Sequence, residues 1–172
     1  MSTSDEVDRI VDAWQQERPD LDVAPLQVLS RVSRLARHLD IARREAFAVN
    51  DLEPGEFDVL AALRRTGKPY SLTPSALISQ SLVTSGTMTN RIDRLESKNL
   101  VARMPDPNDG RGVLVQLTQT GKSAVDRALD ELLAREKSLL ATVSKSDREK
   151  LANVLRDIVL PFDDESAGLE TN

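Results

Sequence analysis

The order of elements predicted in the middle of the sequence constrains the fold more than any other feature. Thr73-Pro74 is typical of a helix start, because a hydroxyl cap is followed by a proline in the first turn, and this helix covers about 74–81. Leu82-Val83 leads to a second cap, Thr84 or Ser85, and to a helix that ends near residue 98. Two helices joined by so tight a connection form the helix-turn-helix pattern.

A strand, a turn and a returning strand follow these two helices. Residues 100–104 favour a strand, 105–110 (Pro-Asp-Pro-Asn-Asp-Gly) are dense in turn residues, and 113–117 favour the second strand. A two-stranded ribbon directly after such a helix is a wing. We therefore predict a mainly α fold with a small β-hairpin wing, a winged helix-turn-helix.

Helices are also predicted on both sides of this segment. Apolar residues recur at helical spacing in about 5–16, 25–49 and 54–67, and again from 118 to about 143 and from 146 to 160, where Pro161 is expected to end the last helix. We expect N-terminal helices in 1–50 (an extra helix plus a dimerisation helix), a winged helix-turn-helix DNA-binding domain in 51–118, C-terminal dimerisation helices in 119–162 and a flexible acidic tail in 163–172.

The charge of the chain is unevenly distributed. The total is -5, yet Leu60–Gly112 carries eight basic and four acidic side chains, a net +4 against -9 for the rest. A basic middle between acidic flanks is typical of a protein that offers one face to phosphate, although an uneven solvated surface would look the same.

The helix from Thr84 to Lys98 has two different faces. Met88, Ile92 and Leu95 fall at i, i+4 and i+7 and are expected to pack inward, while hydroxyls, an amide and a long cation point outward. Such side chains can read base edges in the major groove, and the capped N-terminus can approach phosphate. An ordinary amphipathic helix remains the alternative. The predicted DNA-binding residues are Thr84, Ser85, Thr87, Thr89, Asn90, Arg94 and Lys98.

The turn of the wing adds a further cation. Arg111 follows Gly110 at the tip, where an arginine can enter a narrow minor groove, and Asp109 is close enough to hold it. Both are predicted DNA-binding residues. The alternative is an exposed turn arginine without a specific role.

The chain resembles MarR-type regulators over nearly its whole length. The residues that carry the resemblance are Gly86-Thr87-Met88-Thr89-Asn90-Arg91-Ile92-Asp93-Arg94-Leu95-Glu96, Leu100-Val101 and Asp106-Pro107-Asn108-Asp109-Gly110-Arg111-Gly112-Val113-Leu114-Val115-Gln116-Leu117-Thr118. The resemblance implies a homodimer whose terminal helices interlock and whose two winged helices bind the halves of a palindromic operator in double-stranded DNA.

The extra N-terminal helix resembles the urate-responsive, PecS-like branch of that family. This narrower resemblance implies a purine-type anion held by Trp14, Asp58, Arg91 and Arg103, and hence a repressor that urate releases from DNA. Arg91 is expected to lean inward, where Asp58 could neutralise it without ligand, and a ligand on Arg91 would shift the helix relative to its twin. A structural Asp58–Arg91 ion pair with Trp14 as a core anchor is the alternative reading, and a phenolic or drug-like anion is an alternative effector.

Other classes of protein find less support in the sequence. Cysteine is absent, His38 is the single histidine, and no nucleophile motif, metal-ligand cluster or phosphate-binding glycine loop is recognisable, so we expect no enzyme, no metal and no cofactor. The polar N-terminus and the lack of a long apolar stretch predict a cytoplasmic protein without membrane contact. A winged helix that contacts only proteins is the rival from a different class.

Overall fold

The computed structural model describes residues 4–81, 83–107 and 109–168, with the side chains of 163–168 left aside. Leu82 and Asn108, which belong to the predicted connection and turn, lie outside the described residues, as do 169–172 of the predicted tail. The chain divides into two compact units, the first ending at Leu132 and the second beginning at Leu133. The functional division predicted from the sequence stays a prediction.

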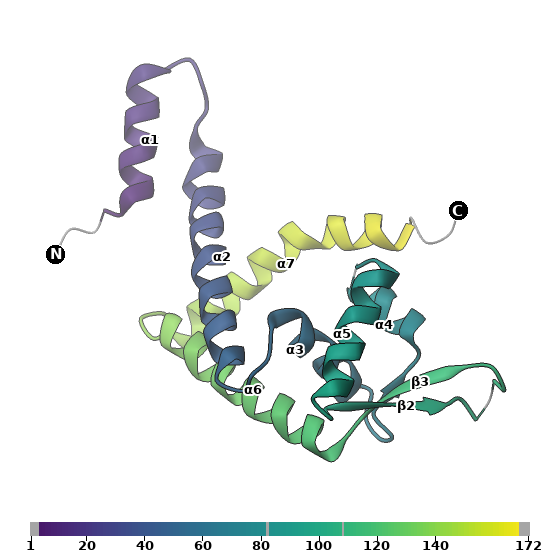
Figure 1. Cartoon of the computed structure of the whole chain (residues 1–172). Helices are drawn as coiled ribbons and strands as arrows, with labels where there is room; N and C mark the ends of the chain where they lie inside the picture. The colour runs from purple at the N-terminus through teal and green to yellow at the C-terminus, as the bar shows by residue number, and fades with distance from the viewer. Residues whose placement is uncertain (1–3, 82, 108, 169–172) are drawn as a thin grey trace. The chain divides into compact units, whose positions relative to one another are not determined.

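The first unit contains six of the helices and the whole sheet (Figure 1). Its helices agree with the predicted elements to within about two residues at most ends. Their bounds are α1 Glu6–Glu17, α2 Ala24–Ala48, α3 Pro54–Arg65, α4 Pro74–Ser81, α5 Ser85–Ser97 and α6 Gln119–Leu139, of which α6 continues into the second unit.

Both predicted caps of the helix-turn-helix are present. Thr73 Oγ1 accepts a hydrogen bond from the Ala76 N–H at 3.2 Å, and Thr84 Oγ1 accepts one from the Thr87 N–H at 3.3 Å. Each hydroxyl satisfies one of the N–H groups that a helix leaves without an internal partner, which stabilises the helix by about 1 kcal/mol. These two local signals fix where α4 and α5 begin, and thereby the helix-turn-helix.

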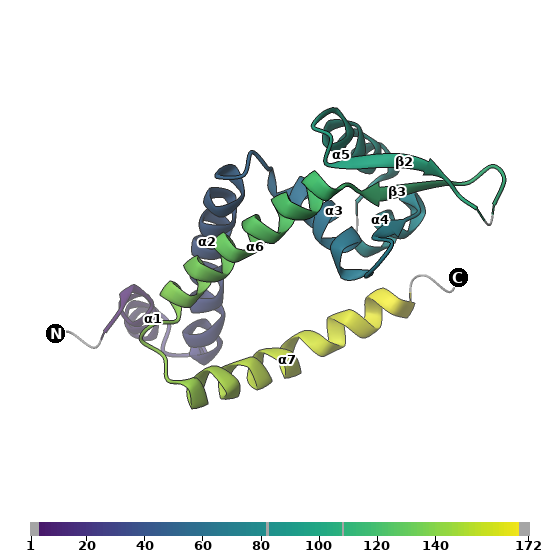
Figure 2. The ribbon, with the colours of Figure 1, turned by 90° about the horizontal axis from the view of Figure 1, so that it is seen from below.

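The sheet has three antiparallel strands in the order β1-β3-β2: β1 Ser71–Leu72, β2 Val101–Pro105 and β3 Val113–Leu117. In the wing, Val101 pairs with Leu117 at the base and Pro105 with Val113 near the tip. Two views show this hairpin projecting beyond α3, α4 and α5 (Figures 1 and 2). Strand β1 was not predicted, because two residues are too few to show alternation and they form a strand only by pairing with β3.

The inner face of α5 packs into the main core, as predicted. Met88, Ile92 and Leu95 are almost fully buried, in one cluster with residues of α3, α4, α6 and the sheet. Burial of a side chain of this size contributes about 1.5–3 kcal/mol, so these three residues anchor α5 firmly. The opposite face of the helix is thereby turned to solvent.

The first turn of α6 lies against the backbone that enters the wing. A Cβ atom on Gly121 would stand 1.9 Å from the carbonyl oxygen of Leu100. That oxygen accepts hydrogen bonds from both the N–H and the hydroxyl of Thr118, each at 3.1 Å, so it cannot easily move. Only glycine fits at this position.

We therefore expect Gly121→Ala to destabilise the protein by about 1–3 kcal/mol, because the backbone must shift to relieve the overlap. In a chain of this size the loss should lower the thermal unfolding midpoint by about 2–12 °C. Gly86→Ala is the matched control: Gly86 also lies in the first turn of a helix, nothing would touch its Cβ, and alanine favours the helix. Equal midpoints for the two variants would contradict this account.

The last helix, α7 Lys145–Gly168, corrects the prediction for the C-terminal end. Ser144 begins it: its Oγ accepts a hydrogen bond from the Asp147 N–H and donates one to Asp147 Oδ2. The prediction that Pro161 ends the helix is wrong, since the helix continues through it. Proline removes one backbone N–H and crowds the preceding turn, but it leaves the residues on either side free to remain helical.

Candidate nucleic-acid interface and effector cavities

The exposed face of α5 carries most of the residues predicted to bind DNA. Thr84, Ser85, Thr87, Thr89, Asn90 and Arg94 are all exposed. Within this set Thr87 Oγ1 lies 3.0 Å from Thr84 Oγ1, and Thr89 Oγ1 donates to the Ser85 carbonyl at 2.9 Å. The face thus presents hydroxyls, an amide and a guanidinium on an element fixed by the core.

Arg94 is held by an acidic residue just before α3. Its Nη1 lies 3.0 Å and 3.1 Å from the two carboxylate oxygens of Glu53, and about half of each side chain is exposed. Glu53 was not recognised in the sequence, because it lies 41 positions away from Arg94. In this arrangement Glu53 forms an ion pair with the cation that the sequence predicts to contact DNA.

Lys98 has a structural role that the sequence did not reveal. Its Nζ donates to Glu56 Oε2 at 3.1 Å and to the Asp51 carbonyl at 2.7 Å, and Glu56 is only 1% exposed. Burial lowers the pKa of Lys98, but the hydrogen bond and charge of Glu56 outweigh that effect and raise it. The ammonium of Lys98 thus neutralises a buried carboxylate, and its contact with DNA stays a prediction.

The tip of the wing differs in one respect from the prediction. Asp109 Oδ1 accepts a hydrogen bond from the backbone N–H of Arg111 at 3.1 Å, and the Gly112 N–H donates to the Asp109 carbonyl at 2.8 Å. In the described part of the wing, Asp109 makes no ion pair with the guanidinium of Arg111. Asp109 thus shapes the turn, and it leaves the exposed side chain of Arg111 available to a partner.

Arg103, a predicted effector residue, links the wing to α5. Its guanidinium bridges the carboxylates of Asp93 and Glu96 on α5, and its backbone N–H donates to Glu96 Oε1 at 3.2 Å. The hydrogen bond to Asp93, with that to Glu96, raises the pKa of Arg103. Two carboxylates already surround this one cation, which disfavours a further anion beside it.

Asp58 and Arg91 do not form the ion pair considered from the sequence. Asp58 Oδ1 instead lies 3.2 Å from Arg43 Nη2. Arg91 lies against Gly55, where a Cβ would stand 2.5 Å from its Cζ. Helical spacing placed Arg91 at the edge of the inner face correctly, but it could not identify the partner of Asp58, which comes from α2.

The two residues line separate cavities. The cavity at Asp58 has a volume of about 280 Å³ and is lined by Arg43, Phe57, Asp58, Ala61, Ala62, Arg65, Gln80 and Ser81. The cavity at Arg91 has a volume of about 400 Å³ and is lined by Asp40, Arg44, Glu53, Pro54, Gly55, Glu56, Thr87, Arg91 and Arg94. Trp14 and Arg103 line neither, so a single chain does not bring the four predicted effector residues together.

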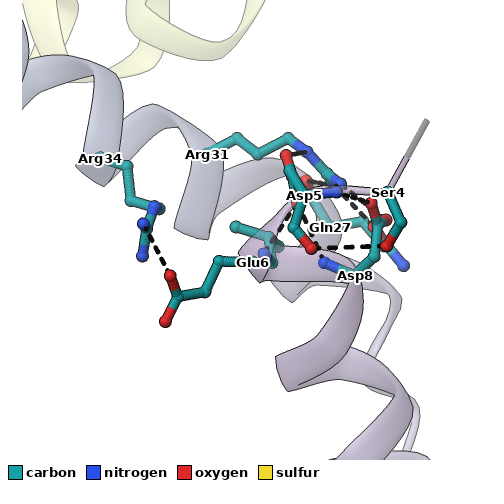
Figure 3. Close-up of polar contacts among 8 residues, drawn as sticks. Ser4, Asp5, Glu6, Asp8, Gln27, Arg31 and Arg34 are labelled. Carbon is teal, nitrogen blue, oxygen red and sulfur yellow. Dashed lines mark hydrogen bonds and ion pairs between the residues drawn. The ribbon is translucent and has the colours of Figure 1, made fainter. Parts of the chain in front are cut away.

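Trp14 lies on α1, which packs against the first half of α2. Val7 and Val11 of α1 are buried in a small cluster with Val23, separate from the main core, while Trp14 remains 49% exposed. Polar contacts reinforce the packing: the Arg31 guanidinium binds Asp5 and Asp8, and Arg34 binds Glu6 (Figure 3). Asp5 also caps α1 through the N–H groups of Val7 and Asp8.

We expect acid to weaken the attachment of α1 to α2. Backbone hydrogen bonds, followed by that of Arg31, hold the pKa values of Asp5 and Asp8 below their ordinary value of 3.8. Their contribution is therefore present above pH 3.8 and is lost as the pH falls through the lowered values. Trp14 is the single tryptophan, so its fluorescence should report the loss. Arg31→Gln should shift that transition to higher pH, whereas Arg9→Gln, also near Glu6 but more exposed, should leave it unchanged.

In the described ranges no helix is both long and apolar enough to cross a membrane, and no cluster of three or more potential metal-ligating side chains occurs.

A short helix, a capped helix with an exposed polar face and a projecting hairpin define the class of winged helix-turn-helix proteins. The MarR family model matches residues 52–113. The transcriptional regulator PecS of Dickeya dadantii is 38% identical over 150 residues, which cover 87% of this chain and 90% of PecS. The chain belongs to the MarR family of transcriptional regulators, and its relatives are regulators, not enzymes.

Solved structures of Escherichia coli MarR share this fold. The apo form superposes with a TM-score of 0.66 at 26% identity and covers 77% of this chain and 96% of its own. A variant of MarR complexed with operator DNA also gives a TM-score of 0.66, at 27% identity, covering 81% of this chain and 99% of its own.

Proposed function

We propose that the chain is a homodimeric repressor that binds a palindromic operator in the cytoplasm and is released from it by a small aromatic anion, urate or a related purine. The observation that carries the proposal is the exposed polar face of α5, held by a buried inner face and followed directly by a projecting wing. The predicted contacts are Thr84, Ser85, Thr87, Thr89, Asn90, Arg94, Lys98, Asp109 and Arg111.

Operator binding is supported by the chemistry of the exposed side chains and by a relative of the same fold. Hydroxyl, amide and guanidinium groups are those that hydrogen-bond to phosphates and to base edges in the major groove. Arg111 on the wing tip is exposed and suited to the minor groove. A relative with the same fold, Escherichia coli MarR, has been solved with operator DNA.

A homodimer is supported by exposed apolar side chains on the terminal helices. In the first unit Val28, Leu29, Val32 and Leu35 lie on α2, and in the second unit Leu151, Val154, Ile158, Val159 and Leu160 lie on α7, all between 40% and 55% exposed. Large exposed apolar patches mark interaction surfaces. Two identical subunits related by a twofold axis match a palindrome whose half-sites lie about one helical turn apart.

The effector is assigned by the resemblance that pointed to Trp14, Asp58, Arg91 and Arg103. Arg91 adds support, since it makes no ion pair within the described residues and lines a cavity with Thr87 and Arg94 of the same helix. A ligand there can release DNA only through a difference in its affinity for the free and the bound form. A phenolic or drug-like anion is the alternative effector.

Binding to labelled duplex DNA from upstream of the gene tests the proposal. We expect the affinity to fall steeply with salt, because cations that contact phosphate displace condensed counterions, and we expect sedimentation to give a dimer. Adding urate should then release the duplex. Binding that is absent or unaffected by salt would favour a winged helix that contacts only proteins, and release by salicylate but not urate would favour the alternative effector.

A further inference from the structure

Arg103 lies where the hairpin of the wing leaves the core. It pairs with Val115 of β3, which is fully buried, so both side chains lie on the inner face of the sheet. Two residues earlier in the strand, Val101 and its partner Leu117 belong to the main core, whereas the last residues of β2 are exposed. Arg103 thus stands between the fixed base of the wing and its projecting end (Figures 1 and 2).

Three polar contacts tie Arg103 to α5. Its guanidinium bridges the carboxylates of Asp93 and Glu96, which lie three residues apart and therefore on one side of the helix. Its backbone N–H donates to Glu96 Oε1 at 3.2 Å, on the side of β2 that faces away from β3, because β2 is an edge strand. A planar guanidinium bound by two carboxylates has a well-defined orientation. The position of β2 relative to α5 is therefore set at this residue.

The angle between the wing and α5 matters for operator binding because the two elements suit different grooves of one duplex. The exposed face of α5 suits the major groove, and Arg111, exposed at the tip, suits a narrow minor groove. Hydrogen bonds tolerate only small errors in distance and direction, so both sets of contacts form together at one angle alone. Since Arg103 lies nearer the base of the hairpin, a small rotation there moves Arg111 much further.

We propose that Arg103 is a positioning residue that sets the angle between the wing and α5, so that Arg111 reaches the minor groove while α5 lies in the major groove. It thereby determines the selectivity for A·T base pairs beneath the wing, where the minor groove is narrow. This role requires no effector. The inference rests on the operator-binding part of the proposed function.

The charge of Arg103 offers a rival explanation, and one variant separates the two. By charge alone, Arg103→Gln would weaken binding, because two carboxylates on α5 would then repel phosphate without compensation. By the same reasoning Asp93→Ala/Glu96→Ala would strengthen binding and leave the contribution of Arg111 intact. If Arg103 instead positions the wing, both changes release the hairpin, and both remove the contribution of Arg111.

Fluorescence anisotropy with the operator duplex measures the contribution of Arg111 in each background. We expect Arg111→Gln to weaken binding about ten-fold in the otherwise wild-type protein. Combined with Arg103→Gln, or with Asp93→Ala/Glu96→Ala, it should weaken binding less than about two-fold further. Replacing A·T by G·C pairs beneath the wing should follow the same pattern, with a clear loss of affinity only where Arg103 is held by both carboxylates.

Arg18→Gln is the matched control. Arg18 forms an ion pair with Asp20 at 2.7 Å just after α1, so this substitution removes the same charge and an ion pair away from the wing. It should leave the ten-fold effect of Arg111→Gln unchanged. Thermal unfolding midpoints within a few degrees of the wild type would show that the variants are folded.

The outcomes that contradict the inference differ from those that contradict operator binding. If Arg111→Gln weakens binding equally in all backgrounds, or has no effect in the wild type, Arg103 does not position the wing on DNA and only this inference is overturned. If the wild type does not bind the duplex, the operator-binding part of the proposed function falls, and the inference with it.

Discussion

Lys98→Met should destabilise the protein by about 3 kcal/mol, since it removes the cation beside the buried carboxylate of Glu56. Loss of one partner of a buried ion pair typically costs about 3–5 kcal/mol, and we expect the lower end because 30% of the Lys98 side chain is exposed. For a chain of this length the thermal unfolding midpoint should fall by roughly 6–12 °C. Differential scanning calorimetry at neutral pH measures the change directly.

A second variant separates the ion pair from simple packing. In Glu56→Gln/Lys98→Met no charge is left buried, and the amide oxygen at position 56 can still accept the hydrogen bond that the Glu53 N–H now donates to Glu56 Oε2 at 2.9 Å. The double variant should recover much of the lost stability, and Lys98→Arg most of it. If the double variant were as unstable as Lys98→Met, the buried charge would not be the cause.

The same pair predicts behaviour at high pH. The pKa of Lys98 is raised above its ordinary value of 10.5 in the folded protein. Its contribution to stability is therefore fully present below pH 10.5 and is lost as the pH rises through the folded-state pKa. The stability difference between wild type and Lys98→Met should accordingly be constant through neutral pH and shrink only in strong alkali.

The elements of this fold are predictable from the sequence where their signals are local. The caps Thr73 and Thr84, the spacing of Met88, Ile92 and Leu95, and the turn residues before Val113 each act within one or two turns of chain. Strand β1 and the continuation of α7 through Pro161 are not local in this sense. Strand β1 forms only because it pairs with β3. Helix α7 continues because the hydrogen bonds of the whole helix outweigh the one that Pro161 removes.

The candidate site was less predictable, because its charged side chains are paired over long distances in sequence. Arg94 with Glu53, Lys98 with Glu56 and Asp58 with Arg43 join residues 15 to 42 positions apart, and three different helices contribute. Helical periodicity indicates which face a residue occupies, but it does not identify which opposite charge lies across from that face. The sequence offered Arg91 as a possible partner of Asp58, whereas the structure pairs Asp58 with Arg43 and places Asp58 and Arg91 at separate cavities.

Glu53→Gln should strengthen operator binding several-fold, and Arg94→Gln should weaken it at least ten-fold. An arginine that contacts a base or phosphate contributes about 1–3 kcal/mol to binding. In the free protein Arg94 is bound to both oxygens of Glu53, so contact with DNA requires this partner to be exchanged for another. The glutamine removes the competing charge, whereas the second substitution removes the cation itself.

Fluorescence anisotropy with the operator duplex, at several salt concentrations, distinguishes this competition from a general effect of charge. Asp51→Asn is the matched control, since Asp51 is 93% exposed, lies two residues from Glu53 and pairs with Lys98 instead of Arg94. It should change the affinity much less than Glu53→Gln does. In the Arg94→Gln background, moreover, Glu53→Gln should lose most of its effect, because no cation remains to be released. A gain of the same size with and without Arg94 would mean that Glu53 acts only through long-range repulsion of the phosphates.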